Sequence, residues 1–445
     1  MMQLSHMHDE NQVTRACLTT VVYIAACLFL VGLGKRHVWG PDELGVVGAA
    51  TAIAHADDSL VSCPDGQSSM ERPSFFYWII AAIFRCGSEN AFWARLPAAL
   101  AAISAATLLF VLARHQGASN LQAVATGLVL ATSYGYFQSG RQCCPDMVVC
   151  LFTVAALLSF RQICRLGSGR AGWYAVFVLC LSAACLTGGW IGPLVTFVSL
   201  AFWWLLQKPL RPSGPVWLLS GCIWALVPIG IWMWFVSRHL TGNATHGVSW
   251  FSAPQCVVGN HPPHSETFFH HLGRILIGSL PWSLLLPWAV AYRVRGPRSR
   301  ACDESVLFAL VWLIVSLIIQ LILTDGREVH LFLGYPAAAL LIGTCLVEVL
   351  EKESDEDSWF KFSSRTLALL MIVAPIGLGI AYWHREGSVL GMGVLMPALC
   401  LSLWAYGKAS AGKWMHFYGI VVGSVMLLLL SYDWRISMQL NQQAH

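Results

Sequence analysis

Residues 92–111, FWARLPAALAAISAATLLFV, are apolar apart from Arg95 and two hydroxyl groups. A helix needs about 20 consecutive apolar residues to cross the roughly 30 Å of hydrocarbon in a bilayer, and this stretch has that length. Its apolar residues run continuously and do not alternate with polar ones, which is typical of a membrane helix and not of a strand in a membrane β-barrel. The stretch therefore predicts a helix that spans a membrane.

Similar apolar stretches recur along the whole chain of 445 residues, of which 56% are hydrophobic and 11% are charged. Soluble domains have roughly 25% charged residues, so this chain has less than half of that charge. By run length we count about thirteen stretches that could span a membrane. They cover residues 17–34, 92–111, 121–138, 147–160, 173–186, 190–207, 216–236, 275–291, 305–323, 331–350, 367–383, 389–406 and 415–431. The sequence thus predicts an all-α polytopic membrane protein, with one membrane domain over residues 1–445 and no soluble C-terminal domain.

Lysine and arginine residues in the short loops predict the orientation, because cytoplasmic loops carry an excess of them. With the N-terminus in the cytoplasm, most of the 27 Lys and Arg residues fall on the cytoplasmic side. An odd number of spans then places the C-terminus outside. Residues 35–90 and 238–274 become two long extracytoplasmic loops. Within the first of them, we expect residues 43–55 and 75–84 to form small helices, the second of them at the membrane interface.

Acidic residues gather in the first long loop, although they are rare in the chain as a whole. Asp42 and Glu43 follow Trp39-Gly40-Pro41 just outside the first predicted span. The pair could cap the helix that begins there, because the positive end of a helix dipole favours carboxylates. Alternatively, one carboxylate could serve as a general base for a substrate at the membrane surface. The dipeptide alone leaves both interpretations open.

Residues 71–78, ERPSFFYW, add a carboxylate, a fixed cation and an aromatic run to the same loop. The aromatic residues could anchor the loop at the headgroup level, where Trp and Tyr are enriched. Arg72 could instead hold a phosphate, and Glu71 could bind a metal ion or a sugar hydroxyl.

Three further polar residues lie at the predicted outer ends of spans. Asp146 opens the fourth span, where it could be a simple N-cap. His264 is one of several histidines in the second long loop, and a lone histidine is more often structural than a ligand. Arg327 precedes the tenth span, where it could reach to the interface or bind a lipid phosphate.

In their order and spacing these motifs resemble the lipid-linked-sugar glycosyltransferases of the GT-C type. The nearest branch is the bacterial 4-amino-4-deoxy-L-arabinose transferases of lipid A, with the related protein mannosyltransferases. That family has Asp-Glu after a Trp-containing turn, and then Glu-Lys-Pro-Pro-x-Phe-Tyr-Trp, as at residues 39–43 and 71–78. Further matches are the ARLPAAL segment at 94–100, Pro145-Asp146, the LTGG turn at 186–189, and His264 ahead of LPWS at 280–283. The resemblance extends over residues 39–336.

The resemblance implies a GT-C bundle of about 13 helices that moves a sugar from a polyprenyl-phosphate donor to a lipid or protein acceptor, with inversion. It places the enzyme in a bacterial inner membrane, with the site on the extracytoplasmic side, and points to lipid A modification or protein mannosylation. The net charge of +4 and the lack of a basic patch give no reason to expect a nucleic-acid partner. The residues that it implies are Asp42, Glu43 and Asp146 for catalysis, Arg72 and Arg327 for the substrate phosphate, and Glu71 and His264 for a divalent metal ion such as Zn, Mg or Mn.

The chain departs from the family pattern at several basic positions. Gly45 stands where the family has an arginine, and Gly188 stands where it has the lysine of the Leu-Thr-Lys-Gly turn. The Lys-Arg pair before the tenth span is reduced to Gly326-Arg327. Fewer positive groups therefore remain to hold the carrier phosphate, which leaves open a relative that binds polyprenyl phosphate without transferring sugar.

A membrane transporter or lipid flippase is the alternative from another functional class. Transporters commonly show internal repeats and ionisable residues near the bilayer midplane. The sequence shows neither feature, because nearly every charge falls at the end of a predicted span.

Overall fold

The computed structural model describes residues 2–55, 75–165, 169–207, 214–239, 268–295, 300–323, 333–351, 358–386 and 395–443. These residues form helices joined by turns, with no strand in the described ranges. The elements are α1 (Met2–Leu30), α2 (Pro41–His55), α3 (Phe75–Cys86), α4 (Ala91–His115), α5 (Asn120–Ala131), α6 (Tyr134–Gly140), α7 (Pro145–Arg165), α8 (Arg170–Gly188), α9 (Ile191–Gln207), α10 (Gly214–His239), α11 (Phe268–Gly278), the 3₁₀ turn η2 (Trp282–Leu284), α12 (Leu286–Arg295), α13 (Arg300–Leu323), α14 (Tyr335–Glu351), α15 (Ser358–Glu386), α17 (Met396–Ser410) and α18 (Trp414–Gln443).

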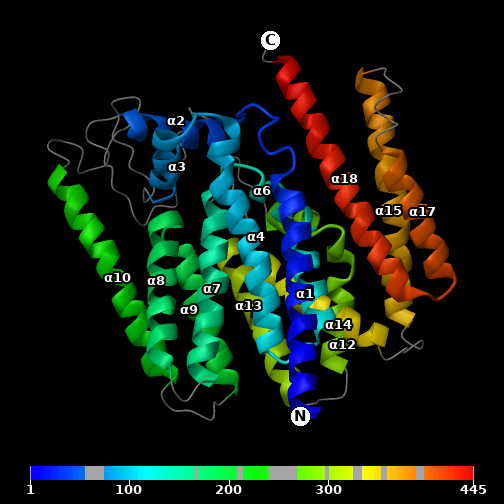
Figure 1. Cartoon of the computed structure of the whole chain (residues 1–445), viewed down its shortest axis with the longest axis horizontal. Coiled ribbons are helices and arrows are strands. Elements are labelled where there is room, and N and C mark those ends of the chain that lie inside the picture. Colours follow the sequence, from blue (N-terminus) through cyan, green and yellow to red (C-terminus); the bar gives the residue numbers. More distant parts are fainter. Residues whose placement is uncertain are drawn as a thin grey trace.

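Most helices run side by side as one bundle, with α4 near its centre (Figure 1). Helix α4 packs against α1, α5 and α7. Ala94, Ala98, Ala102 and Ala106 recur every four residues along α4 and are fully buried. Small side chains at this spacing let neighbouring helices approach closely, which is how membrane helices commonly pack. Residues 92–111 thus form part of the core of the bundle.

Six helices in the described part are long and apolar enough to cross a membrane. There are seven if α11 and the helical segment after it, bent by 113° at their junction, count as one span. Shorter apolar helices add to the bundle, among them α5, α9 and most of α10 and α13. The chain is therefore a polytopic α-helical membrane protein, as predicted. The count of about thirteen spans stays a prediction.

Two predicted spans are broken in the structure, and the two breaks contact each other. The span predicted over 121–138 divides into α5 and α6 at Thr132 and Ser133, and the span predicted over 275–291 divides between α11 and α12. The Tyr134 N–H donates to the carbonyl of Leu280 at 3.0 Å, and the Trp282 indole donates to the Thr132 hydroxyl at 2.9 Å. Interrupted backbone is tolerated at membrane depth only where protein groups satisfy it. Each break supplies partners that the other needs.

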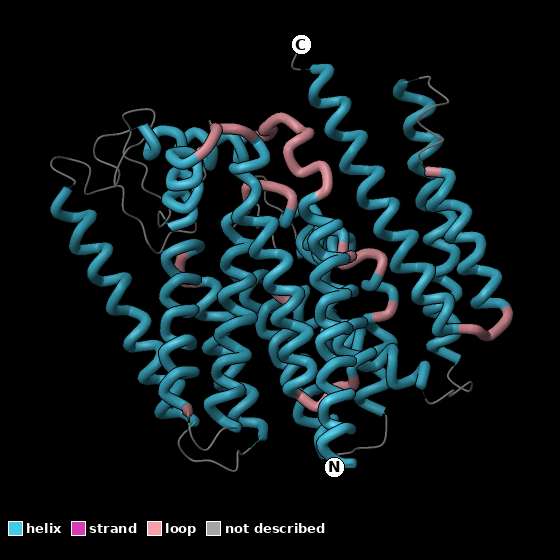
Figure 2. The backbone as a smooth tube through the Cα atoms, viewed as in Figure 1, coloured by secondary structure: helices cyan, strands magenta, loops and turns pink. Residues whose placement is uncertain are grey.

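The two ends of the chain lie at opposite ends of the bundle, as an odd number of spans requires (Figure 1). Helices α2 and α3 lie at the end opposite the N-terminus, and the loop from α1 to α2 is at this end too (Figure 2). With the predicted orientation this end is extracytoplasmic, and we call it the outer rim. The sequence predicted these two small helices over 43–55 and 75–84, and the structure confirms both.

Candidate functional site

A buried ion pair fixes the start of α2 at the outer rim. The Nε and Nη2 groups of Arg95, on α4, donate to the two carboxylate oxygens of Glu43 at 2.7 and 2.8 Å. Arg95 is only 1% exposed and Glu43 only 5%. Two parallel hydrogen bonds between a guanidinium and a carboxylate form a strong and geometrically specific contact. The first turn of α2 is therefore locked to the central helix of the bundle.

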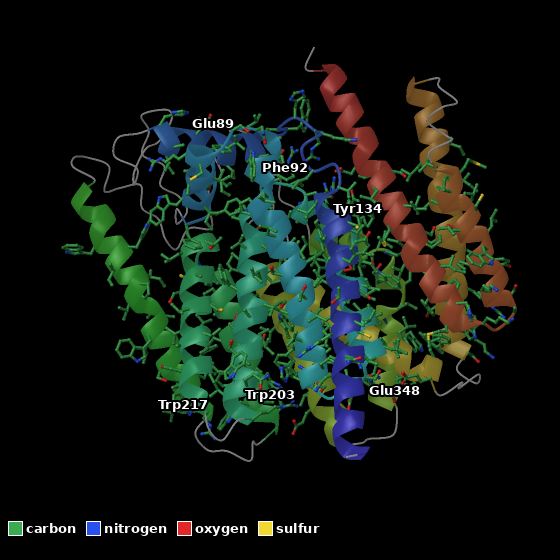
Figure 3. The ribbon with its side chains drawn as sticks, viewed as in Figure 1. Glu89, Phe92, Tyr134, Trp203, Trp217 and Glu348 are labelled. Carbon is green, nitrogen blue, oxygen red and sulfur yellow. The ribbon has the colours of Figure 1, made fainter. Side chains whose placement is uncertain are left out.

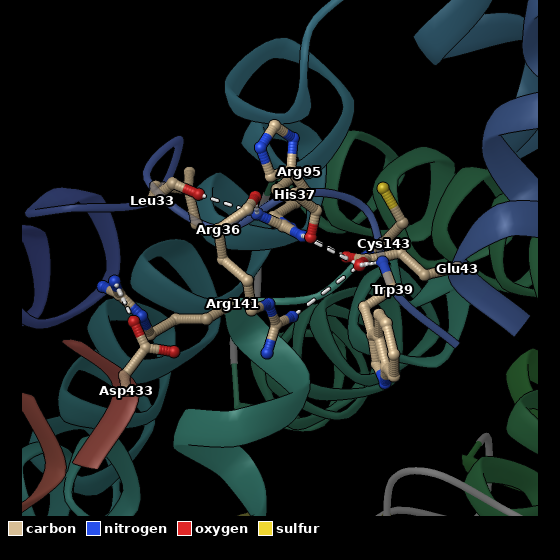
Figure 4. Close-up of polar contacts among 9 residues, drawn as sticks. All are labelled: Leu33, Arg36, His37, Trp39, Glu43, Arg95, Arg141, Cys143 and Asp433. Atoms are coloured by element: carbon tan, nitrogen blue, oxygen red, sulfur yellow. Dashed lines mark hydrogen bonds and ion pairs between the residues drawn. The ribbon is translucent and has the colours of Figure 1, made fainter. Parts of the chain in front are cut away.

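The remaining donors of Arg95 bind the loop between α1 and α2. Its Nη1 group donates to the carbonyls of Leu33 and Arg36 at 3.1 and 2.7 Å, and its Nη2 group donates to the carbonyl of His37 at 3.0 Å. An arginine has five N–H donors and no acceptor, so one side chain can organise a carboxylate and several carbonyls together. Figure 4 shows this arrangement around Glu43. Arg95 thus shapes the loop that leads into the predicted catalytic pair.

Glu43 also ties α2 to the segment that precedes α7. Its carboxylate accepts the backbone N–H of Cys143 at 3.1 Å and that of Trp39 at 3.0 Å. Cys143 lies three residues before Asp146, which is in the first turn of α7. Asp42 is the direct neighbour of Glu43. The same carboxylate therefore brings Asp42 and Asp146 to one part of the rim, although they are far apart in sequence.

Consecutive residues in a helix point about 100° apart. Glu43 is directed into the bundle towards Arg95, so Asp42 has a different direction and is half-buried. Glu43 was predicted as catalytic with Asp42 and Asp146. Both of its oxygens accept hydrogen bonds, from Arg95, Trp39 and Cys143, so Glu43 connects α2 to α4 and to the segment before α7.

Electrostatics at the rim favour an ionised Glu43. Burial alone would raise the pKa of Glu43, but the hydrogen bonds and charge of Arg95, with Arg36 and the Trp39 N–H, outweigh burial and lower it. Arg36 lies 3.7 Å from the same carboxylate. Burial and the repulsion of Arg95 lower the pKa of Arg36. Burial and the charge of Glu43 raise the pKa of the Cys143 thiol.

A second ion pair connects the rim to the last helix. Arg141, just before α7, donates to Asp433 of α18 at 2.7 Å and to the carbonyl of Leu28 at 2.6 Å. One helical position earlier, the hydroxyl of Tyr432 lies 3.4 Å from that of Tyr134, at the α5–α6 break. Arg141 is 3% exposed and the Asp433 side chain is 16% exposed. The C-terminal helix is therefore part of the structure that holds the site.

The far end of α2 is held in a comparable way. Arg85 of α3 donates to the carbonyls of Ile53 and Ala54 in the last turn of α2, both at 3.0 Å. A cation is favourable there because carbonyls at a helix C-terminus are unpaired and carry partial negative charge. His55 contacts Glu89 at 2.6 Å, just before α4. Both ends of α2 are thus tied to the bundle, so its carboxylates have defined positions.

The structure describes three of the seven predicted site residues. Glu43 contacts the backbone three residues before Asp146, and Asp42 precedes Glu43 directly. Glu71, Arg72, His264 and Arg327 lie outside the described residues. Within the described ranges no group of three His, Cys, Asp or Glu side chains could hold a metal ion. The phosphate and metal assignments therefore stay predictions.

Gly45 and Gly188, which stand where the family has basic residues, differ in their surroundings. A Cβ atom built at Gly45 meets nothing within 4 Å, and Gly45 is exposed on α2. A Cβ built at Gly188 would lie 2.5 Å from Cγ2 of Val149. The place of a lysine side chain at position 188 is therefore filled by α7, whereas the place of an arginine at position 45 is open.

Sequence reasoning did not single out Arg95, Arg36, Arg141 or Asp433. One signal could have found Arg95, because it is the only charged residue in the apolar stretch 92–111. An ionisable residue inside a membrane segment has a partner or a function by default. The sequence does not indicate that Glu43 is the partner of Arg95, because the two residues are 52 positions apart.

The chain is similar to known glycosyltransferases in sequence and in fold. A family model described as dolichyl-phosphate-mannose-protein mannosyltransferase matches residues 70–242. The crystal structure of ArnT from Cupriavidus metallidurans bound to undecaprenyl phosphate superimposes with a TM-score of 0.72 at 18% identity, over 93% of this chain and 77% of that one. The chain has the GT-C glycosyltransferase fold.

Relatives in sequence agree with this fold. The undecaprenyl phosphate-alpha-4-amino-4-deoxy-L-arabinose arabinosyl transferase of Aeromonas hydrophila is 25% identical over 369 residues, which are 82% of this chain and 65% of the relative. The enzyme of the same name from Pectobacterium atrosepticum is 23% identical over 431 residues, 95% of this chain and 76% of the relative. The resemblance to the GT-C transferases read from the sequence motifs is thus confirmed.

Proposed function

We propose that this GT-C protein transfers a sugar from a polyprenyl-phosphate donor to a lipid or protein acceptor at the outer face of a bacterial inner membrane. The names of its relatives support a polyprenyl-phosphate donor, and the ArnT structure of the same fold was solved with undecaprenyl phosphate. One observation of this chain carries the proposal. The Glu43 carboxylate binds both Arg95 and the Cys143 N–H, which holds Asp42 and Asp146 at one rim.

The site suits a donor whose lipid tail stays in the bilayer, because its phosphosugar is then presented at the height of the rim. In the proposed reaction an acceptor hydroxyl attacks the anomeric carbon with inversion. The bond from that carbon to the phosphate oxygen breaks, and polyprenyl phosphate leaves with the bonding electrons. Asp42 accepts the hydroxyl proton as general base. Asp146, at the start of α7, orients the acceptor or the sugar.

Charge at the rim favours an anionic headgroup. The buried network contains the cations Arg36, Arg95 and Arg141 and the carboxylates Glu43 and Asp433, so the network itself has one net positive charge. A positive field in a low-dielectric wall attracts an anion and stabilises charge that develops on it. We assign the direct contacts with the phosphate to Arg72 and Arg327, as the sequence resemblance implies.

Glu71 and His264 are the proposed ligands of a divalent metal ion. A carboxylate and an imidazole suit such an ion and leave coordination positions open for a substrate. When bound, the ion would help to neutralise the leaving phosphate. Because both residues lie outside the described ranges, no step of the reaction above depends on it.

The sugar class is a finer question. The relatives are named for a 4-amino-4-deoxy-L-arabinose donor, whereas the matching family model is named for mannose. We propose that the donor is a pentosyl or hexosyl polyprenyl phosphate, with lipid A modification or protein glycosylation as the outcome.

Release of polyprenyl phosphate from a labelled donor, measured on the purified protein in lipid nanodiscs, tests the proposal. Release that depends on an acceptor is the expected result. Binding of the donor without release indicates the non-transferring relative, for which the loss of basic groups at Gly45 and Gly188 is the specific argument. Movement of intact donor across sealed vesicles without release indicates a flippase. Either of these two results overturns the transferase.

A further inference from the structure

A second group of buried polar side chains lies far from the outer rim, between α7, α9 and α13. At its centre is Arg161, which is one turn from the end of α7 and only 4% exposed. Its guanidinium lies over the ring of Trp203 at 4.5 Å and over the ring of Phe308 at 5.2 Å. Trp203 lies towards the end of the bundle that carries the N-terminus (Figure 3). The group is therefore at the cytoplasmic end, across the membrane from Asp42 and Asp146.

The guanidinium of Arg161 has aromatic faces on its flat sides, but its edge is not paired. Among the residues that the structure describes, its Nε and Nη2 atoms have no hydrogen-bond partner. Arg165 and Glu304 lie close enough to influence its charge, yet no described carboxylate lies within 4.0 Å of it. Two aromatic contacts compensate only part of the cost of burying a charge. The buried, unpaired edge of this cation has the chemistry of an anion site.

Further unpaired donors lie on the rings that pack against Phe308, over which Arg161 lies. The indole N–H groups of Trp203 and Trp312 are buried and have no partner in the described part of the chain. The Trp203 ring packs edge-on against Phe308 at 6.1 Å, and the Trp312 ring lies 6.0 Å from the same Phe308. Buried polar atoms without a partner are rare in native proteins, so several together need a common explanation.

One hydroxyl group extends the group along α9. Ser199 precedes Trp203 by one turn, so the two side chains share a helix face. The hydroxyl oxygen of Ser199 is buried and unpaired within the described ranges. Arginine and indole N–H groups only donate, and hydroxyl groups can donate as well. A set composed almost wholly of donors around a positive charge matches an anion with several acceptor oxygens.

We propose that Arg161, Trp203 and Trp312, with Ser199, bind a phosphate group at the cytoplasmic end of the bundle. A phosphate offers oxygens in several directions and pairs well with a guanidinium edge. Basic pockets between membrane helices on the cytoplasmic side commonly hold anionic lipid headgroups. The phosphate can come from such a headgroup or from free inorganic phosphate. This site is separate from the proposed catalytic rim and does not depend on its chemistry.

Thermal unfolding of the purified protein in a zwitterionic detergent tests the proposal. The probes are short-chain phosphatidylglycerol, phosphatidylcholine, inorganic phosphate, and chloride at matched ionic strength. We expect phosphatidylglycerol or inorganic phosphate to raise the Tm of the wild type, and phosphatidylcholine and chloride to leave it unchanged. A rise with inorganic phosphate identifies a free ion as an occupant, and a rise with phosphatidylglycerol alone identifies a lipid headgroup.

Three variants assign the effect to the site. Arg161→Met removes the charge at similar volume and should abolish the shift. Arg15→Met removes an exposed charge on α1 at the same end of the bundle and should retain it. Trp312→Phe keeps the charge and removes one donor, so the apparent affinity should fall roughly tenfold. Trp312→Phe decides the question if Arg161→Met does not fold. Three results would overturn the site. The Tm of Trp312→Phe could rise as much as that of the wild type, chloride could raise the Tm as much as phosphate does, or the Tm of the wild type could stay unchanged.

Discussion

Glu43 and Arg95 form a bidentate ion pair that is almost completely closed to solvent, with N···O distances of 2.7 and 2.8 Å. The pair connects a short helix of the first outer loop to the central helix of the bundle. Because Asp42 precedes Glu43 directly, the position of the proposed base depends on this pair.

Replacement of Glu43 by Gln should destabilise the protein strongly. Removing one partner of a buried pair leaves a buried charge uncompensated, which typically costs about 3–5 kcal/mol. The matched control is Glu89→Gln, because the contact of Glu89 with His55 is exposed and such pairs contribute only about 0–1 kcal/mol. Thermal unfolding in one detergent compares the two variants. Equal losses of Tm would show that the buried pair has no special role.

The stability of the rim should depend on pH in a definite direction. The ordinary pKa of a glutamate is 4.5, and that of Glu43 is lower in the folded protein. Its contribution is therefore complete above pH 4.5 and is lost as the pH falls through the lower, folded-state pKa. We expect an acid-induced decrease of Tm below about pH 4.5 that is reduced in Glu43→Gln. If Tm decreases at low pH in this variant as much as in the wild type, other carboxylates control the acid-induced loss of stability.

Asp42→Asn should abolish sugar transfer while the fold is kept. Loss of a general base typically reduces turnover by about 10²–10⁴-fold. Donor binding should persist, because the asparagine keeps the shape of the side chain and Glu43 still anchors α2. Steady-state release of polyprenyl phosphate and the Tm are measured on the same preparation. Full turnover in this variant would remove Asp42 from the mechanism and direct attention to Asp146.

The structure has room for a basic side chain at position 45 but not at position 188. Gly45→Arg enters open space and should tighten polyprenyl-phosphate binding by roughly tenfold, as one charge-assisted hydrogen bond would. Gly172→Arg, which adds an exposed arginine at the start of α8, is the control and should have no effect.

Gly188→Lys should lower the Tm because its Cβ meets Val149, and Val149→Ala should recover part of that loss. A stable Gly188→Lys would contradict the close packing of α7 and α8.

Metal binding should depend on Glu71 and His264 together. We expect one equivalent of a divalent metal in the purified wild type and none in the Glu71→Gln, His264→Ala double variant, measured by elemental analysis after dialysis. His270→Ala serves as the control from the same histidine-rich loop. Unchanged metal content in the double variant would exclude these two side chains as the ligands.

Much of the fold follows from the sequence because run length and hydropathy decide which segments enter a bilayer. The small helices α2 and α3 were also predicted, since each is a compact segment between polar residues. The breaks at Thr132 and near Leu280 were not predicted. Each break is stabilised by the other, and they lie 150 positions apart, so neither has a local signal.

The same reason limits prediction of the site. Asp42 and Asp146 were proposed because their motifs and order resemble those of a known family, and their roles stay predictions. The role of Glu43 could not be separated from that of Asp42, because it depends on Arg95 and on the Cys143 backbone. These contacts arise only when α2, α4 and α7 have assembled.

The bond between Arg141 and Asp433 joins positions 292 residues apart. During synthesis, Arg141 enters the membrane long before its counter-ion has been translated. Until α18 arrives, this cation must be accommodated by water or by lipid phosphates at the surface. Insertion of α18 then supplies Asp433 to Arg141, so this part of the rim is complete only after a segment 292 positions later has entered the bundle.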